Sequence, residues 1–433
     1  MYLDLQDFVF PREVEAVTSK SVAHRLLILG ALSSRESSFK IRRPGSDIQH
    51  TVDCLRALGA EVTLMPKLEF DTEIYKVKPI DLEHPPRYAV LNCGDSGSTL
   101  RFLLPVAAAL GVEATFIRTG RLAERPLGPL QDVLHEHGVR FFMDDKGNLC
   151  SRGIFDGTDF SIPGNISSQF ITGLLFAMAI FRHPSHLSIT GELESAPYLQ
   201  MTIGKIRMYK VPVRMEGMEI EMPGRDAFQL RRPRCPLMEG DWSGSAVFLA
   251  AGAVSRRDVT VHGLDTRTVQ GDRAILSLLM NFHAAVSKPD GNSVRVEPSS
   301  LKATYIDARH TPDLVPILAV LALCASGKTV IDNASRLRLK ESNRLAAVTE
   351  LLNAVGGNCI EFEDGLIIYG VDKRSLRGAL VDSKNDHRIA MAAALIATML
   401  PYGETIRIRN AECVDKSWPH FWDDLGVMGK LRN

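Results

Sequence analysis

The chain has 433 residues, of which 45% are hydrophobic and 24% are charged, and its 51 Lys and Arg balance 51 Asp and Glu. A chain of this length can form two sizeable hydrophobic cores, and its zero net charge excludes an overall field that would draw it to nucleic acid or to a membrane. Any affinity for anions must therefore come from local clusters of basic residues.

Six very apolar stretches occur along the chain, each with polar or basic residues at its start. They begin at Ser19, Ser96, Ser167, Asp241, Thr311 and Asn385. Their spacing of about 70 to 80 residues predicts six copies of one supersecondary unit, three in each of two domains. Helices that are apolar on every side lie inside a core, whereas their N-terminal ends present unpaired N–H groups that favour phosphate or carboxylate.

Between these stretches, amphipathic segments with apolar residues at three- and four-residue steps predict helices that are covered on one face. They begin at Thr51, Leu130, Thr202, Ala274 and Arg344. Short β-branched runs at Val259, Thr329 and Thr405 predict strands. We expect each unit to run strand, helix, two strands, helix, strand. Prolines and arginines interrupt the pattern at Arg231–Pro236 and predict the domain boundary there.

Several other features limit the class of protein. Seven cysteines without a close pair predict reduced thiols in a cytoplasmic protein and no zinc site. The acidic start MYLDLQDFVF predicts no targeting segment, and the apolar runs 314–325 and 389–400 are too short to span a bilayer. Gly327-Lys328-Thr329 matches the end of a nucleotide-binding loop, but it precedes a strand instead of a helix, and we interpret it as a helix-ending turn.

The sequence places the candidate ligand-binding side chains at the helix starts. In the first, Ser21 and Arg25 lie four residues apart and share a helix face, with Lys20 beside the free N–H groups. The alternative is that Ser21 only caps the helix and that both cations are solvated. The second helix opens with Gly94-Asp95-Ser96-Gly97-Ser98, whose glycines allow a ligand to approach the backbone closely.

Four further segments add basic and polar groups. Arg121 and Arg125 precede a proline, where a guanidinium could bind carboxylate or phosphate, although an exposed basic turn would look the same. Ser167-Ser168-Gln169 opens the third apolar helix, with plain capping as the alternative. Lys340 and Arg344 share a helix face after a strand, and Asp386-His387-Arg388 opens the sixth apolar helix.

In these motifs and their order, the chain resembles the enolpyruvyl transferase family, specifically the 5-enolpyruvylshikimate-3-phosphate synthases. The resemblance covers essentially the whole chain. It rests on Ser-Lys-Ser…His-Arg at 19–25, Gly-Asp-Ser-Gly-Ser-Thr-Leu-Arg at 94–101, Glu-Arg-Pro at 124–126, Ser-Ser-Gln-Phe at 167–170, Pro-Asp at 312–313, Arg-Leu-Lys-Glu-Ser-Asn-Arg at 338–344, Asn-Asp-His-Arg at 385–388 and Lys-Ser-Trp-Pro at 416–419.

The resemblance implies a two-domain inside-out α/β barrel, with three repeated βαβαββ-type units of buried helices and outer sheets per domain. Residues 20–232 would form the N-terminal domain, which mainly binds shikimate 3-phosphate, and residues 1–19 plus 233–433 the C-terminal domain. The active site would lie in the interdomain cleft, which closes on the substrates. The implied reaction transfers the enolpyruvyl group of phosphoenolpyruvate to the 5-hydroxyl of shikimate 3-phosphate, with release of phosphate, in the shikimate pathway.

The resemblance also implies the site residues. Catalysis would fall to Lys20, Asp313 and Glu341, although Asp313 could also serve as a helix cap. Shikimate 3-phosphate would be bound by Ser21, Arg25, Ser167, Ser168, Gln169, Ser195, Tyr198, Asp313 and Lys340. Phosphoenolpyruvate would be bound by Lys20, Gly97, Arg125, Gln169, Arg344, Arg388 and Lys416. We expect no cofactor, no metal, no nucleic-acid or membrane partner, and a cytoplasmic monomer.

The chain departs from the family pattern at Val17-Thr18, where members usually carry a proline, and at Asp95 and Arg336, where asparagine is common; we leave these out of the site. One alternative is the sister transferase that acts on UDP-N-acetylglucosamine, but Ser21 replaces its asparagine and the loop 111–125 lacks its reactive cysteine. A second alternative is a noncatalytic anion-binding repeat protein.

Overall fold

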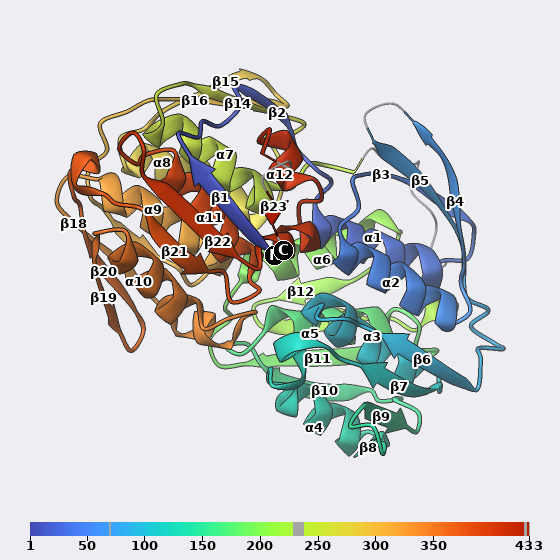
Figure 1. Cartoon of the computed structure of the whole chain (residues 1–433). Coiled ribbons are helices and arrows are strands. Elements are labelled where there is room, and N and C mark those ends of the chain that lie inside the picture. The colour runs from blue at the N-terminus through green and yellow to red at the C-terminus, as the bar shows by residue number, and fades with distance from the viewer. Residues whose placement is uncertain (69–70, 228–237, 428–430, 433) are drawn as a thin grey trace. The chain divides into compact units, whose positions relative to one another are not determined.

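The computed structural model of the chain describes residues 1–68, 71–227, 238–427 and 431–432. These residues form two compact units (Figure 1). The N-terminal unit is Lys20–Met238, and the C-terminal unit combines Met1–Ser19 with Glu239–Asn433. The boundary that the sequence predicts at Arg231–Pro236 lies outside the described residues.

The six predicted apolar helices are confirmed, and nearly all of their side chains are buried. They are α1 (Lys20–Leu32), α3 (Gly97–Ala109), α5 (Ser168–Met178), α7 (Trp242–Val254), α9 (Val315–Cys324) and α11 (His387–Ala397). Five of them begin one or two residues after the predicted polar start. Helix α9 begins later because the short 3-10 helix η4 (Pro312–Leu314) precedes it.

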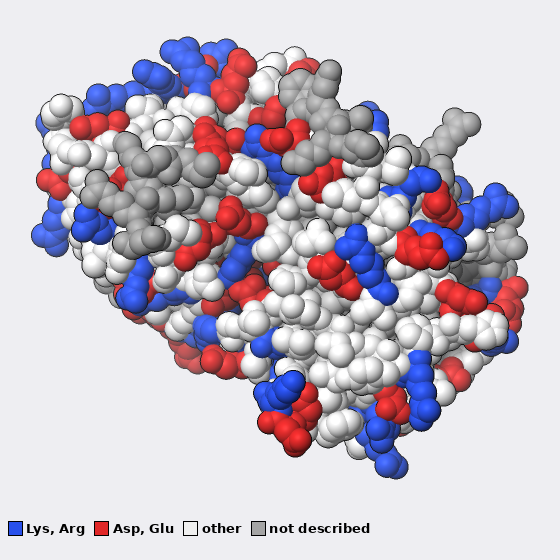
Figure 2. All heavy atoms as spheres, turned by 45° about the vertical axis from the view of Figure 1, so that its right-hand side comes forward, with Lys and Arg blue, Asp and Glu red and all other residues white. Residues whose placement is uncertain are grey.

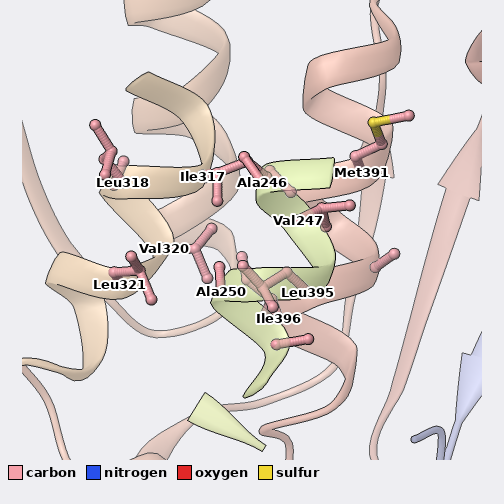
Figure 3. Close-up of a cluster of buried hydrophobic side chains, with 14 of the residues drawn as sticks. Ala246, Val247, Ala250, Ile317, Leu318, Val320, Leu321, Met391, Leu395 and Ile396 are labelled. Carbon is pink, nitrogen blue, oxygen red and sulfur yellow. The ribbon is translucent and has the colours of Figure 1, made fainter. Parts of the chain in front are cut away.

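Within each unit, the apolar helices pack against one another. Figure 3 shows the core of the C-terminal unit, where Ala246 and Ala250 of α7 lie among Ile317 and Val320 of α9 and Leu395 of α11. In the N-terminal unit, α3 and α5 approach so closely that a Cβ atom on Gly173 would lie 2.2 Å from the carbonyl oxygen of Arg101. Small side chains at the contacts therefore set the spacing of these helices.

The amphipathic helices are also confirmed. They are α2 (Ser46–Ala57), α4 (Gly128–Glu136), α6 (Ala196–Met208), α8 (Ile275–Asn281) and α10 (Arg344–Ala354). The predicted strands correspond to β14 (Val259–His262), β18 (Lys328–Asp332) and β22 (Thr405–Arg409). Residues 325–327 connect α9 to β18, and Lys328 and Thr329 are the first two residues of that strand, so the segment follows a helix and precedes a strand as predicted.

The described strands form six separate sheets, three in each unit. In the N-terminal unit, the first sheet has the strand order β3 (Ser37–Arg42), β5 (Thr72–Lys78) and β4 (Glu61–Leu68). The second has the order β6 (Tyr88–Asn92), β7 (Glu113–Ile117), β9 (Leu149–Arg152) and β8 (Arg140–Met143). The third has the order β10 (Asp159–Pro163), β11 (Ser185–Thr190), β13 (Glu219–Met222) and β12 (Arg214–Glu216). In the C-terminal unit, one sheet has the strand order β21 (Ala379–Asp382), β22, β1 (Tyr2–Gln6) and β23 (Leu431–Arg432). Another has the order β15 (Ala285–Asp290), β16 (Ser293–Glu297), β14 and β2 (Glu13–Glu15). The last has the order β17 (Tyr305–Asp307), β18, β20 (Gly365–Tyr369) and β19 (Asn358–Phe362).

The order of elements that the residue pattern predicts within a unit is wrong, whereas the βαβαββ order that the resemblance implies is confirmed. The structure shows strand, helix, strand, helix and then a hairpin of two strands, as in β10, α5, β11, α6, β12 and β13. The first two strands of such a repeat are parallel, and the buried helix is the crossover between them. The hairpin was misplaced because its strands are short and carry little apolar alternation; β12, for example, has three residues.

This topology explains where the polar helix starts lie. In the repeats β6-α3-β7, β10-α5-β11, β17-α9-β18 and β21-α11-β22, the segment before each buried helix follows the carboxyl end of a parallel strand. Crevices at the carboxyl ends of parallel strands are common ligand sites in α/β proteins. The fold therefore positions the helix starts of each unit for binding.

Charged side chains of both signs are interspersed on the face of the molecule that Figure 2 presents, in keeping with the balanced composition. Among the helices in the described part of the chain, none combines the length and the apolar character needed to cross a membrane.

Candidate active site

In the N-terminal unit, Lys20 is the first residue of α1, and its Nζ atom lies 3.0 Å from Oδ2 of Asp47. Asp47 belongs to the first turn of α2, and both side chains are largely buried, with exposed fractions of 19% and 11%. This ion pair joins the starts of two helices. The sequence did not predict Asp47, because a residue 27 positions away gives no local sign of the pairing.

Arg25 joins α1 to α6. Its Nη1 donates to the carbonyl of Ser21 at 2.8 Å, its Nε to Oγ1 of Thr202 at 2.8 Å, and its Nη2 to the carbonyl of Tyr198 at 3.2 Å. Burial lowers the pKa of Arg25 to about 10, so the guanidinium remains charged at neutral pH. Ser195, which precedes α6, has a left-handed backbone with φ of 55°, a conformation that non-glycine residues adopt mainly where the surroundings impose it.

Gly97 and Arg125 lie in direct contact. A Cβ atom added to Gly97 would lie 3.1 Å from Nη1 of Arg125, so the guanidinium covers the first turn of α3. The side chain of Ser96 caps this helix by accepting a hydrogen bond from the amide of Thr99 at 3.3 Å. A cation and a helix N-terminus are thus combined at one place, which favours an anion.

Gln169, at the start of α5, is held from two sides. Its Nε2 donates to Oγ of Ser98 at 2.9 Å, and its Oε1 accepts from Nη1 of Arg101 at 2.7 Å. Arg101 also donates to the carbonyl of Pro126 at 3.1 Å, next to Arg125. Ser167 caps the helix by accepting from the amide of Gln169 at 3.3 Å, so the capping interpretation of that serine is correct.

In the C-terminal unit, four predicted residues and Asp386 form one ionic cluster centred on Arg344. The guanidinium of Arg344 donates from Nη1 to Asp313 at 2.7 Å and from Nη2 to Glu341 at 2.8 Å. It also donates from Nε to Asp386 at 2.8 Å. Lys340 lies 3.3 Å from Asp313. The arrangement can bind or release anions by exchanging carboxylates for ligand oxygens.

The electrostatics of the cluster favour the charged form of Asp313. Burial alone would raise the pKa of Asp313, but Lys340, Arg344 and Arg388 together hold it well below its ordinary value. Burial lowers the pKa of Lys340 in spite of the opposing effect of Asp313. Burial would likewise lower the pKa of Arg344, yet Asp386 and the other two carboxylates raise it well above its ordinary value.

The remaining predicted cations lie at or near the start of α11. Arg388 donates from Nη1 to the carbonyl of Ser243 at 2.6 Å and also contacts the Ser243 hydroxyl. Lys416, the last residue of the 3-10 helix η7 (Ala411–Lys416), donates to the carbonyl of Asn385 at 2.8 Å. Asp313 lies inside η4 and not at a cap position, so the alternative that it caps the fifth apolar helix is wrong.

The predicted site residues therefore divide between the two units. The structure brings Ser21, Arg25 and Tyr198 together, places Gly97 against Arg125, and gathers Lys340, Glu341 and Arg344 around Asp313. The sequence did not predict which side chains hold the site residues in place. They are Asp47, Ser98, Arg101, Thr202, Ser243 and Asp386, and Ser98, Arg101 and Asp386 among them lie in motifs that the sequence analysis names. Within the described ranges, no three His, Cys, Asp or Glu side chains are grouped to hold a metal ion.

Comparison with known proteins identifies the family. The model of the EPSP synthase family (3-phosphoshikimate 1-carboxyvinyltransferase) matches residues 11–425. The chain belongs to the EPSP synthase family. It is 38% identical to the 3-phosphoshikimate 1-carboxyvinyltransferase of Clostridium kluyveri, over 99% of this chain and 97% of that relative. The corresponding protein of Clostridium beijerinckii is 36% identical, over 96% and 95%.

Solved structures show the same fold. EPSP synthase from Acinetobacter baumannii superposes with a TM-score of 0.78 at 23% identity, over 98% of this chain and 97% of that one. An enolpyruvyl transferase from Streptomyces tendae superposes with a TM-score of 0.76 at 17% identity, over 99% and 97%. The predicted α/β fold of the enolpyruvyl transferases is confirmed, and membership of the EPSP synthase family favours neither the UDP-N-acetylglucosamine transferase nor a noncatalytic repeat protein.

Proposed function

We propose that this chain transfers the enolpyruvyl group of phosphoenolpyruvate to the 5-hydroxyl of shikimate 3-phosphate and releases phosphate. The observation that carries the proposal is the match to the EPSP synthase family over residues 11–425, together with curated relatives of that activity along nearly the whole chain. The chemistry of the helix starts agrees with it, because both units present cations and hydroxyl groups there.

Charge complementarity supports the choice of substrates. Each substrate carries a carboxylate and a phosphate, and a phosphate bears about −1.5 to −2 charges at neutral pH. We assign shikimate 3-phosphate to Ser21, Arg25, Ser167, Ser168, Gln169, Ser195, Tyr198, Asp313 and Lys340. We assign phosphoenolpyruvate to Lys20, Gly97, Arg125, Gln169, Arg344, Arg388 and Lys416.

The reaction needs two proton removals and two proton additions. The 5-hydroxyl oxygen forms a bond to C2 of phosphoenolpyruvate and loses its proton, while C3 gains a proton, and a tetrahedral adduct results. The bond between C2 and the phosphate oxygen then breaks, the departing phosphate takes up a proton, C3 loses a proton, and the enol ether and phosphate are formed. We propose that Lys20, Asp313 and Glu341 serve these transfers, because each is a proton-carrying side chain that is largely buried yet keeps an exposed fraction, of 19%, 26% and 20% respectively.

The resting state of Asp313 fits a group that acts only when substrate is bound. Its pKa is held low by Lys340, Arg344 and Arg388, so in the resting cluster it is a weak base. Substrate anions that bind these cations would neutralise them and remove their effect on the carboxylate. The pKa of Asp313 would then rise toward the range in which it can accept a proton.

Both units would have to act on one pair of substrates, and we propose an active site between them that closes when the substrates bind. Closure of such a site excludes water and strengthens the charge interactions within it. We also propose that the protein acts as a monomer in the cytoplasm. One chain supplies every proposed group, and the six described cysteines are free thiols, which suits a reducing compartment.

The decisive experiment measures phosphate release with each substrate alone and with both together. Release only when both are present is expected, and replacing shikimate 3-phosphate with UDP-N-acetylglucosamine should abolish it. The variant Lys20→Met should fold and lose turnover, whereas the matched control Lys146→Met, in an exposed turn, should retain it. Near-normal release by Lys20→Met would remove Lys20 from the mechanism, and no release by the unaltered protein would overturn the proposed function.

A further inference from the structure

The guanidinium of Arg344 has two edges with different partners. Asp386 binds it side-on, because its Oδ2 accepts from Nε at 2.8 Å and its Oδ1 accepts from Nη2 at 3.2 Å. Asp313 and Glu341 instead bind the end of the guanidinium, at Nη1 and Nη2. A planar guanidinium that is held bidentately on one edge is fixed in orientation, and its other edge then points in a defined direction.

The carboxylates that contact Arg344 differ in how deeply they are buried. The side chains of Arg344 and Asp386 have exposed fractions of 1% and 0%. Those of Asp313 and Glu341 have exposed fractions of 26% and 20%. The contact with Asp386 is therefore buried inside the unit, whereas the other two carboxylates are partly accessible to a ligand.

Asp386 is itself held in place, and it reaches a second arginine. The hydroxyl of Ser342 donates to its Oδ2 at 3.0 Å. Its Oδ1 accepts from the backbone amide of Arg388 at 2.9 Å and so caps α11. One buried carboxylate thus fixes the side chain of Arg344 and the backbone of Arg388, the two arginines of the C-terminal unit that we assign to phosphoenolpyruvate.

We propose that Asp386 is a positioning residue for phosphoenolpyruvate, which it serves by fixing Arg344 so that the Nη1 and Nη2 atoms face the substrate. The incoming anion takes the places that Asp313 and Glu341 occupy in the resting cluster, while the bond to Asp386 persists. This inference rests on the proposed function, since it names the partner of an arginine within that site. The competing explanation is that Asp386 serves the fold alone, as a cap of α11.

The variant Asp386→Asn distinguishes the two explanations. Asparagine caps helices as well as aspartate does and has nearly the same size, but it has no charge and only one acceptor oxygen for Arg344. We expect the KM for phosphoenolpyruvate to rise about 10- to 100-fold, the range that the loss of a hydrogen bond between charged groups produces. The KM for shikimate 3-phosphate should stay within about twofold, because the orientation of Arg344 concerns the other substrate.

The matched control is Ser342→Ala, which removes one hydrogen bond to Asp386 but leaves both of its bonds to Arg344. We expect its KM for phosphoenolpyruvate to remain within about threefold of the unaltered protein. KM does not depend on the fraction of protein that is folded, so a loss of stability alone cannot produce the expected difference between the two substrates. If Asp386→Asn does not fold, Asp386→Glu, which displaces the carboxylate from Arg344, is measured by the same two KM values.

Each result decides the matter. A selective rise in the KM for phosphoenolpyruvate supports the inference, and the absence of a rise, or an equal rise for both substrates, overturns it. A comparable selective rise in Ser342→Ala also overturns it, because that variant keeps Arg344 paired. If the unaltered protein releases no phosphate with both substrates, the proposed function is wrong, and this inference, which rests on it, is wrong too. If the unaltered protein is active but the KM values do not change as expected, only this inference is wrong.

Discussion

Replacing Gly97 with alanine tests the contact between the start of α3 and Arg125. The added Cβ would lie 3.1 Å from Nη1 and 3.2 Å from Cζ and Nη2 of the guanidinium, which must give way by a few tenths of an ångström. The obstructing atoms are the far end of a flexible side chain, so the fold should tolerate the change. The backbone of Gly97 does not have a positive φ and adds no strain.

The expected change in KM follows from how far the Arg125 guanidinium is displaced. A misplacement of about 1 Å in a binding group can cost about 100-fold, so a few tenths of an ångström should raise the KM for phosphoenolpyruvate roughly 10-fold, equal to about 1.4 kcal/mol. The KM for shikimate 3-phosphate should change little. The free energy of unfolding should stay level or rise by up to about 1 kcal/mol, because alanine favours the helix more than glycine does.

Steady-state kinetics with each substrate varied in turn, together with urea unfolding, would measure these quantities. The matched control is Gly204→Ala in α6, where an added Cβ has no atom within 4 Å, so it should alter neither KM. An unchanged KM for phosphoenolpyruvate in Gly97→Ala would show that Arg125 does not bind this substrate in the position seen here. A loss of more than about 2 kcal/mol of stability would show that the guanidinium cannot yield.

Two further predictions concern Asp313 and His24. Asp313→Ala should lower kcat by about 10²- to 10⁴-fold while shikimate 3-phosphate still binds, as measured by turnover and by calorimetric titration, and a full rate would remove Asp313 from the mechanism. Burial, with Lys20 and Arg25 nearby, holds the pKa of His24 well below 6.5, so below that pH the unfolded chain binds a proton that the folded chain does not. Stability should therefore fall by about 1.4 kcal/mol between pH 7.5 and 5.5 through this group. His24→Asn should reduce that fall in urea unfolding, and an identical pH dependence in both proteins would contradict a neutral buried His24.

The sequence by itself predicted the features that depend on local patterns. The six apolar helices were found because full burial leaves no polar face, and their starts were found because helix ends need capping groups. The residues expected at the site were also local groups, such as Lys340, Glu341 and Arg344, although the helix face predicted to be shared by Lys340 and Arg344 is wrong, because α10 begins only at Arg344. Hydrophobic periodicity and capping act over a few residues, so they can be read along the chain.

The tertiary structure alone decided which of these groups meet. Arg25 bonds to Thr202 across 177 residues, and Arg344 bonds to Asp386 across 42 residues. Such pairs depend on the register of packed helices and strands, and no local pattern of either partner specifies the other. The order of the hairpin strands was misjudged for the same reason, because short half-exposed strands gain their structure from their neighbours in the sheet.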